Sequence, residues 1–279
     1  MSPRNVRLLA SVAIAAVAIF SFLQCESARA EGSEEPASGI IRSRVVRVEP
    51  NRLVAILGGD ATEPDKVFTL PMERFLTLAR SPDSGVQVEE SAVRLWGRRL
   101  RVDHVGSQGA SYLLVDLDSS AMWWVHPKEK AYVEWRKPAG AAKSPTPTPQ
   151  LEALEQASAI NGFSARAFRL QTSDGTALLW IAQEPRGLRT VLASFGELQR
   201  AVKPVPESLD QLALRLGMDS GVPVRVQVLT PKSYTVHEIV AFEQRSWPAD
   251  EFSVPAGWKA VPVERAHESA EGKPCDSCP

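Results

Sequence analysis

The stretch from Val86 to Trp135 reads VQVEESAVRLWGRRLRVDHVGSQGASYLLVDLDSSAMWWVHPKEKAYVEW, and it decides the fold class. Runs rich in Val, Leu, Tyr and Trp are separated by turns at Gly97, at 117–120 and at Pro127. Such enrichment is typical of strands, and the runs follow one another at hairpin spacing. Because no helical pattern lies between them, this stretch predicts an antiparallel meander.

The sequence on either side of the meander adds further strands. Residues 41–57 predict two strands around a turn at 49–51, and a short helix is predicted to begin at Pro71. Residues 151–160 are predicted to form a short helix or turn. Further strands are predicted at 163–170, 176–182, 222–229 and 234–244.

Two amphipathic helices are predicted late in the chain. Apolar residues recur at helical spacing over 188–202. A second helix has Ser208 and Gln211 spaced as a capping box and Gly217 as its C-terminal cap. A sheet of about ten strands tends to curl or close, and the helices need a face to cover. We therefore expect an α+β, mainly β fold in which a curved sheet wraps around its helices.

The first thirty residues predict a cleavable secretory signal. Arg4 and Arg7 precede an apolar run over 8–23, and Ala28-Arg29-Ala30 supplies the small residues that a signal peptidase reads. A transmembrane anchor is an alternative, since the run is nearly long enough to span a bilayer. A lipoprotein acylated on Cys25 is another. We expect a periplasmic or secreted protein that is soluble after cleavage.

The rest of the chain is predicted to contain one folded domain with loose ends. Residues 31–39 are polar and acidic, which predicts a disordered N-terminus. Residues 40–263 are expected to form a single domain, interrupted by a Pro-rich linker at 138–149 that favours extended geometry. Residues 264–279 are expected to form a polar tail.

The tail carries the motif Cys-x-x-Cys at Cys275 and Cys278. A bridge between them would close a very short loop and could not staple the core. An inert disulfide, redox or partner-docking thiols, and a copper or zinc ligand set that includes His267 all remain open. One His and two Cys fall short of a full tetrahedral zinc set.

Composition and motifs exclude several classes of function. The formal net charge of −1 offers no electrostatic footprint for nucleic acid. Hydrophobic residues at 44% and charged residues at 23% are ordinary for a globular domain with a proper core. The sequence has no Gly-x-Ser-x-Gly elbow, phosphate-binding loop or His-Glu-x-x-His motif. We therefore expect no enzyme activity, no cofactor and no metal.

Aromatic residues and Met122 gather in one part of the predicted sheet. The run Met122 to Val125 is apolar on both faces, so both faces of that strand must be covered. Plain core packing is one explanation, and a face that lines a lipid-accepting cavity is the other. The members of this group are Trp96, Met122, Trp123, Trp124, Tyr132 and Trp135.

A basic group lies beside one predicted hairpin, at Arg94, Arg98, Arg99 and Arg101. A solvated edge is one interpretation, because charge at a sheet edge prevents aggregation. An anionic lipid head group or an acidic partner is the other, since arginine binds such groups in a bidentate manner.

A family resemblance is carried by segments 98–103, 112–116, 122–127, 130–135, 161–163, 179–182, 221–224 and 252–258. Together they resemble the bacterial lipoprotein-localisation carrier (LolA/LolB-like) superfamily, and most of all an uncharacterised secreted branch of it. The resemblance spans about residues 40–263, while the Pro-rich linker and the Cys-x-x-Cys tail depart from the pattern. It implies an unclosed, strongly curved antiparallel β-barrel with a few helices packed in its concave mouth, and an apolar cavity that accepts acyl chains. Relatives bind lipoproteins or glycolipids, or sense envelope stress.

We therefore expect an exported, monomeric, non-enzymatic protein that binds a lipid, acyl chain or lipoprotein, with 188–202 as a lid. The alternative is an envelope protein-interaction or signalling module that uses the curved sheet as a docking surface. Arg99 and Arg101 are the candidates for a head group or partner. The candidate cavity residues are Trp96, Met122, Trp124, Tyr132, Trp180, Leu192 and Phe195.

Overall fold

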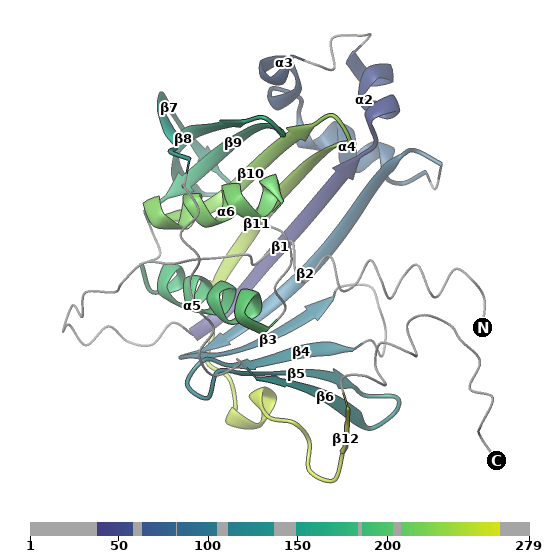
Figure 1. The fold of residues 1–279 in the computed structure, drawn as a ribbon, viewed down its shortest axis with the longest axis vertical. Helices are drawn as coiled ribbons and strands as arrows, with labels where there is room; N and C mark the ends of the chain where they lie inside the picture. Colours follow the sequence, from purple (N-terminus) through teal and green to yellow (C-terminus); the bar gives the residue numbers. More distant parts are fainter. Residues whose placement is uncertain are drawn as a thin grey trace.

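The computed structural model describes residues 38–57, 63–81, 83–104, 111–136, 149–183, 186–202 and 208–262. These residues form a mainly β fold with one twelve-stranded sheet that curves without closing, an open barrel (Figure 1). The fold class expected from the sequence is confirmed, with twelve strands in place of about ten. The predicted signal, the linker over 138–148 and the tail with Cys275 and Cys278 lie outside the described residues.

The strands are β1 (Ser38–Val48), β2 (Val86–Trp96), β3 (Arg99–His104), β4 (Tyr112–Asp116), β5 (Ala121–His126), β6 (Ala131–Arg136), β7 (Glu152–Ile160), β8 (Phe163–Thr172), β9 (Gly175–Ala182), β10 (Val222–Thr230), β11 (Ser233–Gln244) and β12 (Lys259–Val261). Their order in the sheet is β12-β6-β5-β4-β3-β2-β1-β11-β10-β9-β8-β7. All neighbours are antiparallel except β12, which pairs with β6 in parallel. The predicted meander over β2–β6 is confirmed, and β1 joins it to a second meander over β7–β11.

The helices are α2 (Pro50–Leu57), α3 (Pro64–Phe68), α4 (Met72–Leu78), α5 (Arg186–Val202), α6 (Leu209–Ser220) and the 3-10 helix η1 (Ala249–Phe252). In Figure 1, α5 and α6 lie together over one face of the sheet, whereas α2, α3 and α4 lie near one end of the long strands. The two groups of helices cover opposite faces, because alternate residues of the same strands pack against them. On β9, for example, Leu179 belongs to the cluster under α5 and α6, and Leu178 to the cluster under α3 and α4.

The face under α5 and α6, called the inner face, carries the larger hydrophobic core. Its cluster joins residues of β2–β5 with residues of β8–β10, which lie in opposite halves of the sheet. Ile41 of β1 and Ile239 of β11 connect the two halves, so the cluster extends across most of the sheet and includes the buried sides of α5 and α6. Val93, Leu100 and Leu179 are fully buried examples from both halves.

The opposite face, called the outer face, carries a second core under the early helices. Phe75 of α4 and Tyr234 of β11 are both fully buried, with ring centroids 5.5 Å apart. Gln227 Nε2 donates hydrogen bonds to the Tyr234 hydroxyl at 2.8 Å and to the Phe68 carbonyl at 3.0 Å. Burial raises the pKa of Tyr234 to about 12, so its hydroxyl stays protonated.

Two segments differ from the sequence prediction. Residues 50–57 form helix α2 rather than a second strand, with Pro50 at its first position. The run over 53–57 is apolar and short, and periodicity alone does not separate strand from helix in such runs. Residues 152–160 form strand β7 rather than a helix or turn, because pairing with β8 outweighs the local preference of this Glu- and Ala-rich segment.

Helix α6 begins as predicted and ends later than predicted. The Ser208 hydroxyl accepts from the Gln211 backbone N–H, and the Gln211 side chain accepts from the Ser208 backbone N–H, so the capping box is confirmed. Gly217 is not the cap, since the helix continues to Ser220. A Cβ at Gly217 would lie 3.1 Å from side-chain atoms of Leu179 and Pro223, so this glycine allows α6 to approach the sheet closely.

Replacing Ser208 by Ala is expected to lower the free energy of unfolding by about 1 kcal/mol, because one orphan N–H of α6 loses its acceptor. Urea denaturation followed by circular dichroism measures the change. Ser164→Ala, at an exposed position of β8, is the matched control and should change stability little. Equal effects of the two substitutions would contradict a stabilising role for the capping box.

Candidate functional site

Helix α5 covers the inner face with one apolar stripe. Its stripe residues are 0–6% exposed, and all of them belong to the inner cluster. The periodicity predicted for 188–202 is therefore confirmed as a packing face. The stripe residues are Leu188, Val191, Leu192, Phe195 and Leu198.

A small cavity lies where α5 and α6 meet β1, β10 and β11. It has about 30 Å³ of space, room for about two waters. Ile41, Leu192, Leu214 and Met218 form most of its apolar wall. Ligand pockets have volumes of roughly 300 to 1,000 Å³, so the inner face is closed in this conformation.

His237 lines this cavity and pairs with Asp210 of α6. His237 on β11 is 5% exposed, and its Nε2 lies 3.3 Å from Asp210 Oδ2 on α6. The Nδ1 atom of His237 is buried and has no hydrogen-bond partner within the part of the chain that the structure describes. This pair links α6 to the middle of the sheet.

A buried ion triad lies on the outer face of the same strands. The Glu238 side chain is 1% exposed and accepts hydrogen bonds from Arg44 Nη2 at 2.8 Å and from Arg225 Nε at 2.9 Å. Burial alone would raise the pKa of Glu238, but the hydrogen bonds and charges of the two arginines outweigh it and lower that pKa. The carboxylate is therefore charged at neutral pH, and both of its oxygens are paired.

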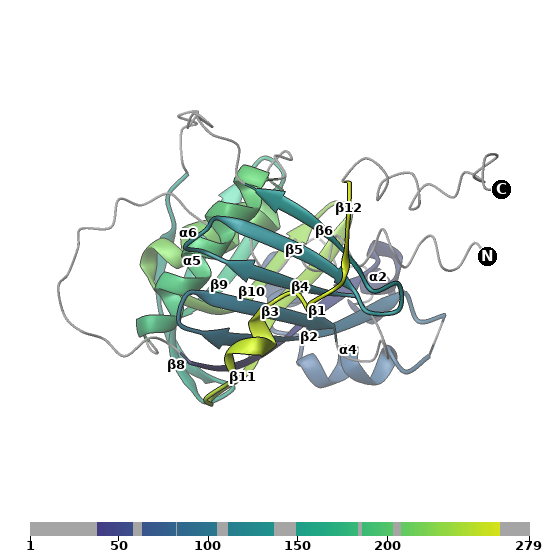
Figure 2. The same cartoon turned by 90° about the horizontal axis from the view of Figure 1, so that it is seen from below.

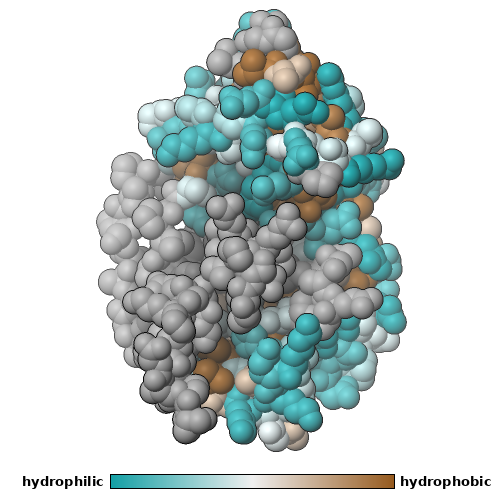
Figure 3. Space-filling view, turned by 90° about the vertical axis from the view of Figure 1, so that its right-hand side faces the viewer, coloured by the Kyte–Doolittle hydropathy of each residue, from teal (hydrophilic) through white to brown (hydrophobic). Residues whose placement is uncertain are grey.

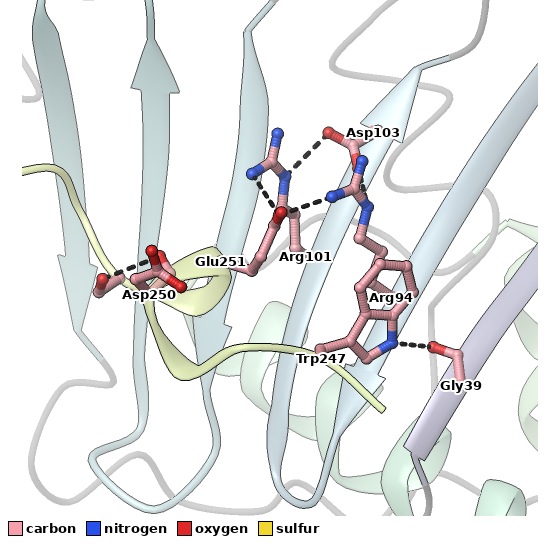
Figure 4. A network of polar contacts seen from close by, with 8 residues as sticks. Gly39, Arg94, Arg101, Asp103, Trp247, Asp250 and Glu251 are labelled. Carbon is pink, nitrogen blue, oxygen red and sulfur yellow. Dashed lines mark hydrogen bonds and ion pairs between the residues drawn. The ribbon is translucent and has the colours of Figure 1, made fainter. Parts of the chain in front are cut away.

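Residues 245–258, called the C-terminal strap, cross the outer face over β2 and β3 (Figure 2). Glu251 accepts hydrogen bonds from Arg94 at 2.6 Å and from Arg101 at 3.1 Å, and Asp103 pairs with both arginines (Figure 4). Trp247 Nε1 donates to the Gly39 carbonyl at 2.9 Å. These contacts hold the strap against the sheet, and they engage Nε and Nη1 of Arg101.

An open groove of about 270 Å³ lies between the strap and β3–β6. Phe252 is 4% exposed and packs on Trp96, with ring centroids 5.9 Å apart. The Arg99 guanidinium lies over the same Trp96 ring, 5.4 Å from its centroid. The residues that line the groove are Arg99, Asp116, Trp123, Tyr132, Phe252, Ser253 and Val254.

The candidate cavity residues do not form one site. Met122, Leu192 and Phe195 belong to the inner cluster, and Trp124 shares their face because it pairs with inner Leu113. Trp96 and Tyr132 instead lie at the groove on the outer face, and Trp180 packs against both clusters.

The two arginines proposed for a head group also differ from one another. Arg101 is engaged by Asp103, Glu251 and the Tyr112 ring, whose centroid is 4.0 Å away, while Arg99 lines the groove. Sequence reasoning missed Asp116 and Phe252 as groove residues. Phe252 reaches the groove from far along the chain, and no local signal indicates this contact.

The described residues contain no group of three or more His, Cys, Asp or Glu side chains that could hold a metal ion. Within the same residues, no helix combines the length and apolar character needed to cross a membrane.

Comparisons with known proteins give a family but no activity. The sequence pattern of a family described as "Domain of unknown function (DUF4412)" matches residues 87–258, from β2 to the end of the strap. No curated protein matches the chain.

Similar solved structures include an uncharacterised conserved protein from Thermus thermophilus, at 10% identity and a TM-score of 0.38. The match covers 81% of this chain and 91% of that one. Two structures of PNGF-II, in the P21 and C2 space groups, are 8% and 7% identical with TM-scores of 0.37 and 0.39. Those matches cover 84% of this chain but only 34% and 33% of the PNGF-II chains. The family match spans more than half of the sequence, and the chain therefore belongs to the DUF4412 family.

Proposed function

We propose that the protein is an exported, non-enzymatic carrier or sensor that takes up the acyl chain of a lipid or lipoprotein between the inner face and α5. The observation that carries this proposal is the stripe of five buried apolar side chains that α5 lays on a continuous apolar surface. An acyl chain is apolar and extended, so it can take the place of this row of side chains on the inner face. The resemblance to LolA/LolB-like carriers supports the same function.

Volumes and burial free energies favour a mechanism in which the acyl chain replaces the α5 stripe on the inner face. They disfavour one in which the chain fills the existing small cavity. The 30 Å³ cavity is far too small for an acyl chain, so α5 must move outward. Exposing five large apolar side chains costs roughly 7–15 kcal/mol at about 1.5–3 kcal/mol each. Burying a chain of about fourteen carbons gains on the order of 11 kcal/mol at about 0.8 kcal/mol per CH₂. The free energy lost when the α5 side chains are exposed is therefore comparable to the free energy gained when the acyl chain is buried. An acyl chain can then displace α5 from the inner face at little net cost.

The alternative, a docking surface on the sheet, has less support. Among the described side chains, Val54 is the one large hydrophobic residue that is exposed, at 46%. The coloured surface in Figure 3 is mainly hydrophilic, with small separate hydrophobic areas. Docking surfaces usually offer a larger contiguous apolar patch.

Replacing Leu192 by Glu is expected to abolish uptake of tetradecanoate, because a carboxylate would then occupy the apolar wall where α5 meets the sheet. Native mass spectrometry of the protein from an exported fraction, before and after incubation with tetradecanoate, measures the bound fraction. Thr190→Glu places the same charge on the exposed side of α5 and should leave uptake unchanged.

Leu192→Ala distinguishes loss of the site from loss of the fold. This substitution removes apolar volume from the cavity wall without adding charge, so uptake should persist or increase. Near-ultraviolet circular dichroism verifies that each variant is folded. Equal uptake by the Leu192→Glu and Thr190→Glu proteins, both folded, would refute binding under α5.

A further inference from the structure

The groove between the strap and β3–β6 contains Arg99, whose guanidinium is held in place but is only partly engaged in ion pairs. Its neighbours Arg94 and Arg101 share the carboxylates of Asp103 and Glu251, and Arg98 pairs with Asp118 at 2.6 Å. Arg99 has one ion-pair contact, from its Nε to Asp116 Oδ2 at 3.5 Å. Within the described part of the chain, its two terminal nitrogens have no hydrogen-bond or ion-pair partner.

Two neighbours fix the orientation of the Arg99 guanidinium. The Trp96 ring lies under it at 5.4 Å, and Asp116 lies on its Nε side. Asp116 is itself held in place, because its Oδ1 accepts hydrogen bonds from the backbone N–H groups of Asp118 and Ser119. Trp96 covers one face of the guanidinium and Asp116 contacts its Nε, so the two terminal nitrogens point together toward a ligand. This pair of nitrogens matches the two oxygens of a carboxylate.

The rest of the groove is suited to an apolar body. Trp123 and Tyr132 come from β5 and β6, and Phe252 and Val254 come from the strap. The groove has about 270 Å³ of space, close to the lower limit for small-ligand pockets. Three aromatic side chains, the Arg99 cation and the Asp116 carboxylate that pairs with its Nε therefore line a space of small-molecule size.

We propose that this groove binds a small organic anion, a carboxylate carried on a flat apolar body, with Arg99 holding the carboxylate and Trp123 contacting the body. The groove lies on the outer face, so the sheet separates it from the surface under α5. The ligand of the groove is therefore not the head group of an acyl chain bound on the inner face. This site is independent of the function proposed above.

The test is a titration with 4-phenylbutyrate, followed by the indole N–H resonances in ¹⁵N-labelled protein. The resonances of Trp96 and Trp123 should shift, while those of Trp124 and Trp135 on the inner face should not. Arg99→Gln should weaken binding roughly ten- to hundredfold, as expected for a lost charge-assisted hydrogen-bond pair. Arg99→Lys keeps the charge but loses the bidentate hydrogen bonding. Its affinity for 4-phenylbutyrate should lie between those of the Arg99→Gln and native proteins.

Matched controls separate specific recognition from general charge. Arg98→Gln removes the same charge from the adjacent exposed position and should leave the affinity unchanged. The neutral amide 4-phenylbutyramide should bind roughly ten- to hundredfold more weakly than the acid. Equal binding of acid and amide, equal effects of the two Gln substitutions, or no shift at Trp96 and Trp123 would each overturn the proposal. Shifts confined to Trp124 and Trp135 would overturn it too and place the anion on the inner face.

Discussion

Replacing Glu238 by Gln is expected to lower the free energy of unfolding by about 3–5 kcal/mol, because two guanidinium groups then lose the charge that they share in the sheet. The side chains of Arg44 and Arg225 are only 15% and 24% exposed, so water compensates them poorly. Loss of one partner of a buried ion pair costs more than the intact pair contributes, since the remaining charges stay desolvated. Urea denaturation at neutral pH measures the change.

The same carboxylate predicts how stability depends on pH. The pKa of Glu238 is lowered in the folded protein from its ordinary value of 4.5. A group with a depressed folded pKa contributes stability above its unfolded pKa, and this contribution disappears as the pH falls through the folded pKa. The stability difference between native protein and Glu238→Gln should therefore be largest near neutral pH and shrink below about pH 4.5.

Glu243→Gln is the matched control on the same strand. Glu243 pairs with Arg42 at 3.5 Å, and both side chains are more than half exposed. Exposed pairs of this kind contribute at most about 1 kcal/mol, so this variant should remain close to the native protein at every pH. If both variants lost the same stability, or if the Glu238 effect did not change with pH, the triad would not stabilise the sheet as argued.

The sequence predicts the fold well where its periodicity is strong and long. The meander over 86–135 follows from strand-forming runs at hairpin spacing, which a helix does not explain. The helix over 188–202 follows from apolar residues at helical spacing, which a strand does not explain. Strand β7 was missed because an exposed edge strand shows no alternation of apolar and polar residues. One signal was available, since Asn161-Gly162 is a typical hairpin dipeptide. Its residues adopt φ values of 49° and 85° and join β7 to β8.

The candidate site could be predicted only in part, for two physical reasons. Consecutive residues of a strand point to opposite faces, so one aromatic cluster in the sequence becomes two clusters in space. Trp123 lines the outer groove, whereas Trp124 lies on the inner face. The second reason is sequence distance: Glu251 lies 150 positions from Arg101, and no local pattern indicates their contact.

Replacing Phe195 by Ala is expected to destabilise the protein by about 3–5 kcal/mol and at the same time to favour acyl-chain binding. Phe195 is fully buried between α5 and the inner face, so truncation leaves an apolar cavity where we propose the cargo binds. Engineered apolar cavities of about 150 Å³ stay dry and accept apolar guests. Tetradecanoate at about one hundred times its dissociation constant should therefore restore about 2.7 kcal/mol, measured by urea denaturation with and without the fatty acid.

Phe75→Ala shows whether this recovery depends on the inner face. Phe75 is equally buried but lies in the outer core under α4, so its truncation should have a similar cost. That cavity lies away from the α5 stripe, and a long acyl chain should bring little recovery there. A small guest such as benzene can fill either cavity, so only the long chain discriminates between the two sites. Equal recovery of both variants by tetradecanoate would mean that the surface under α5 has no special affinity for acyl chains, and the carrier function would have to be abandoned.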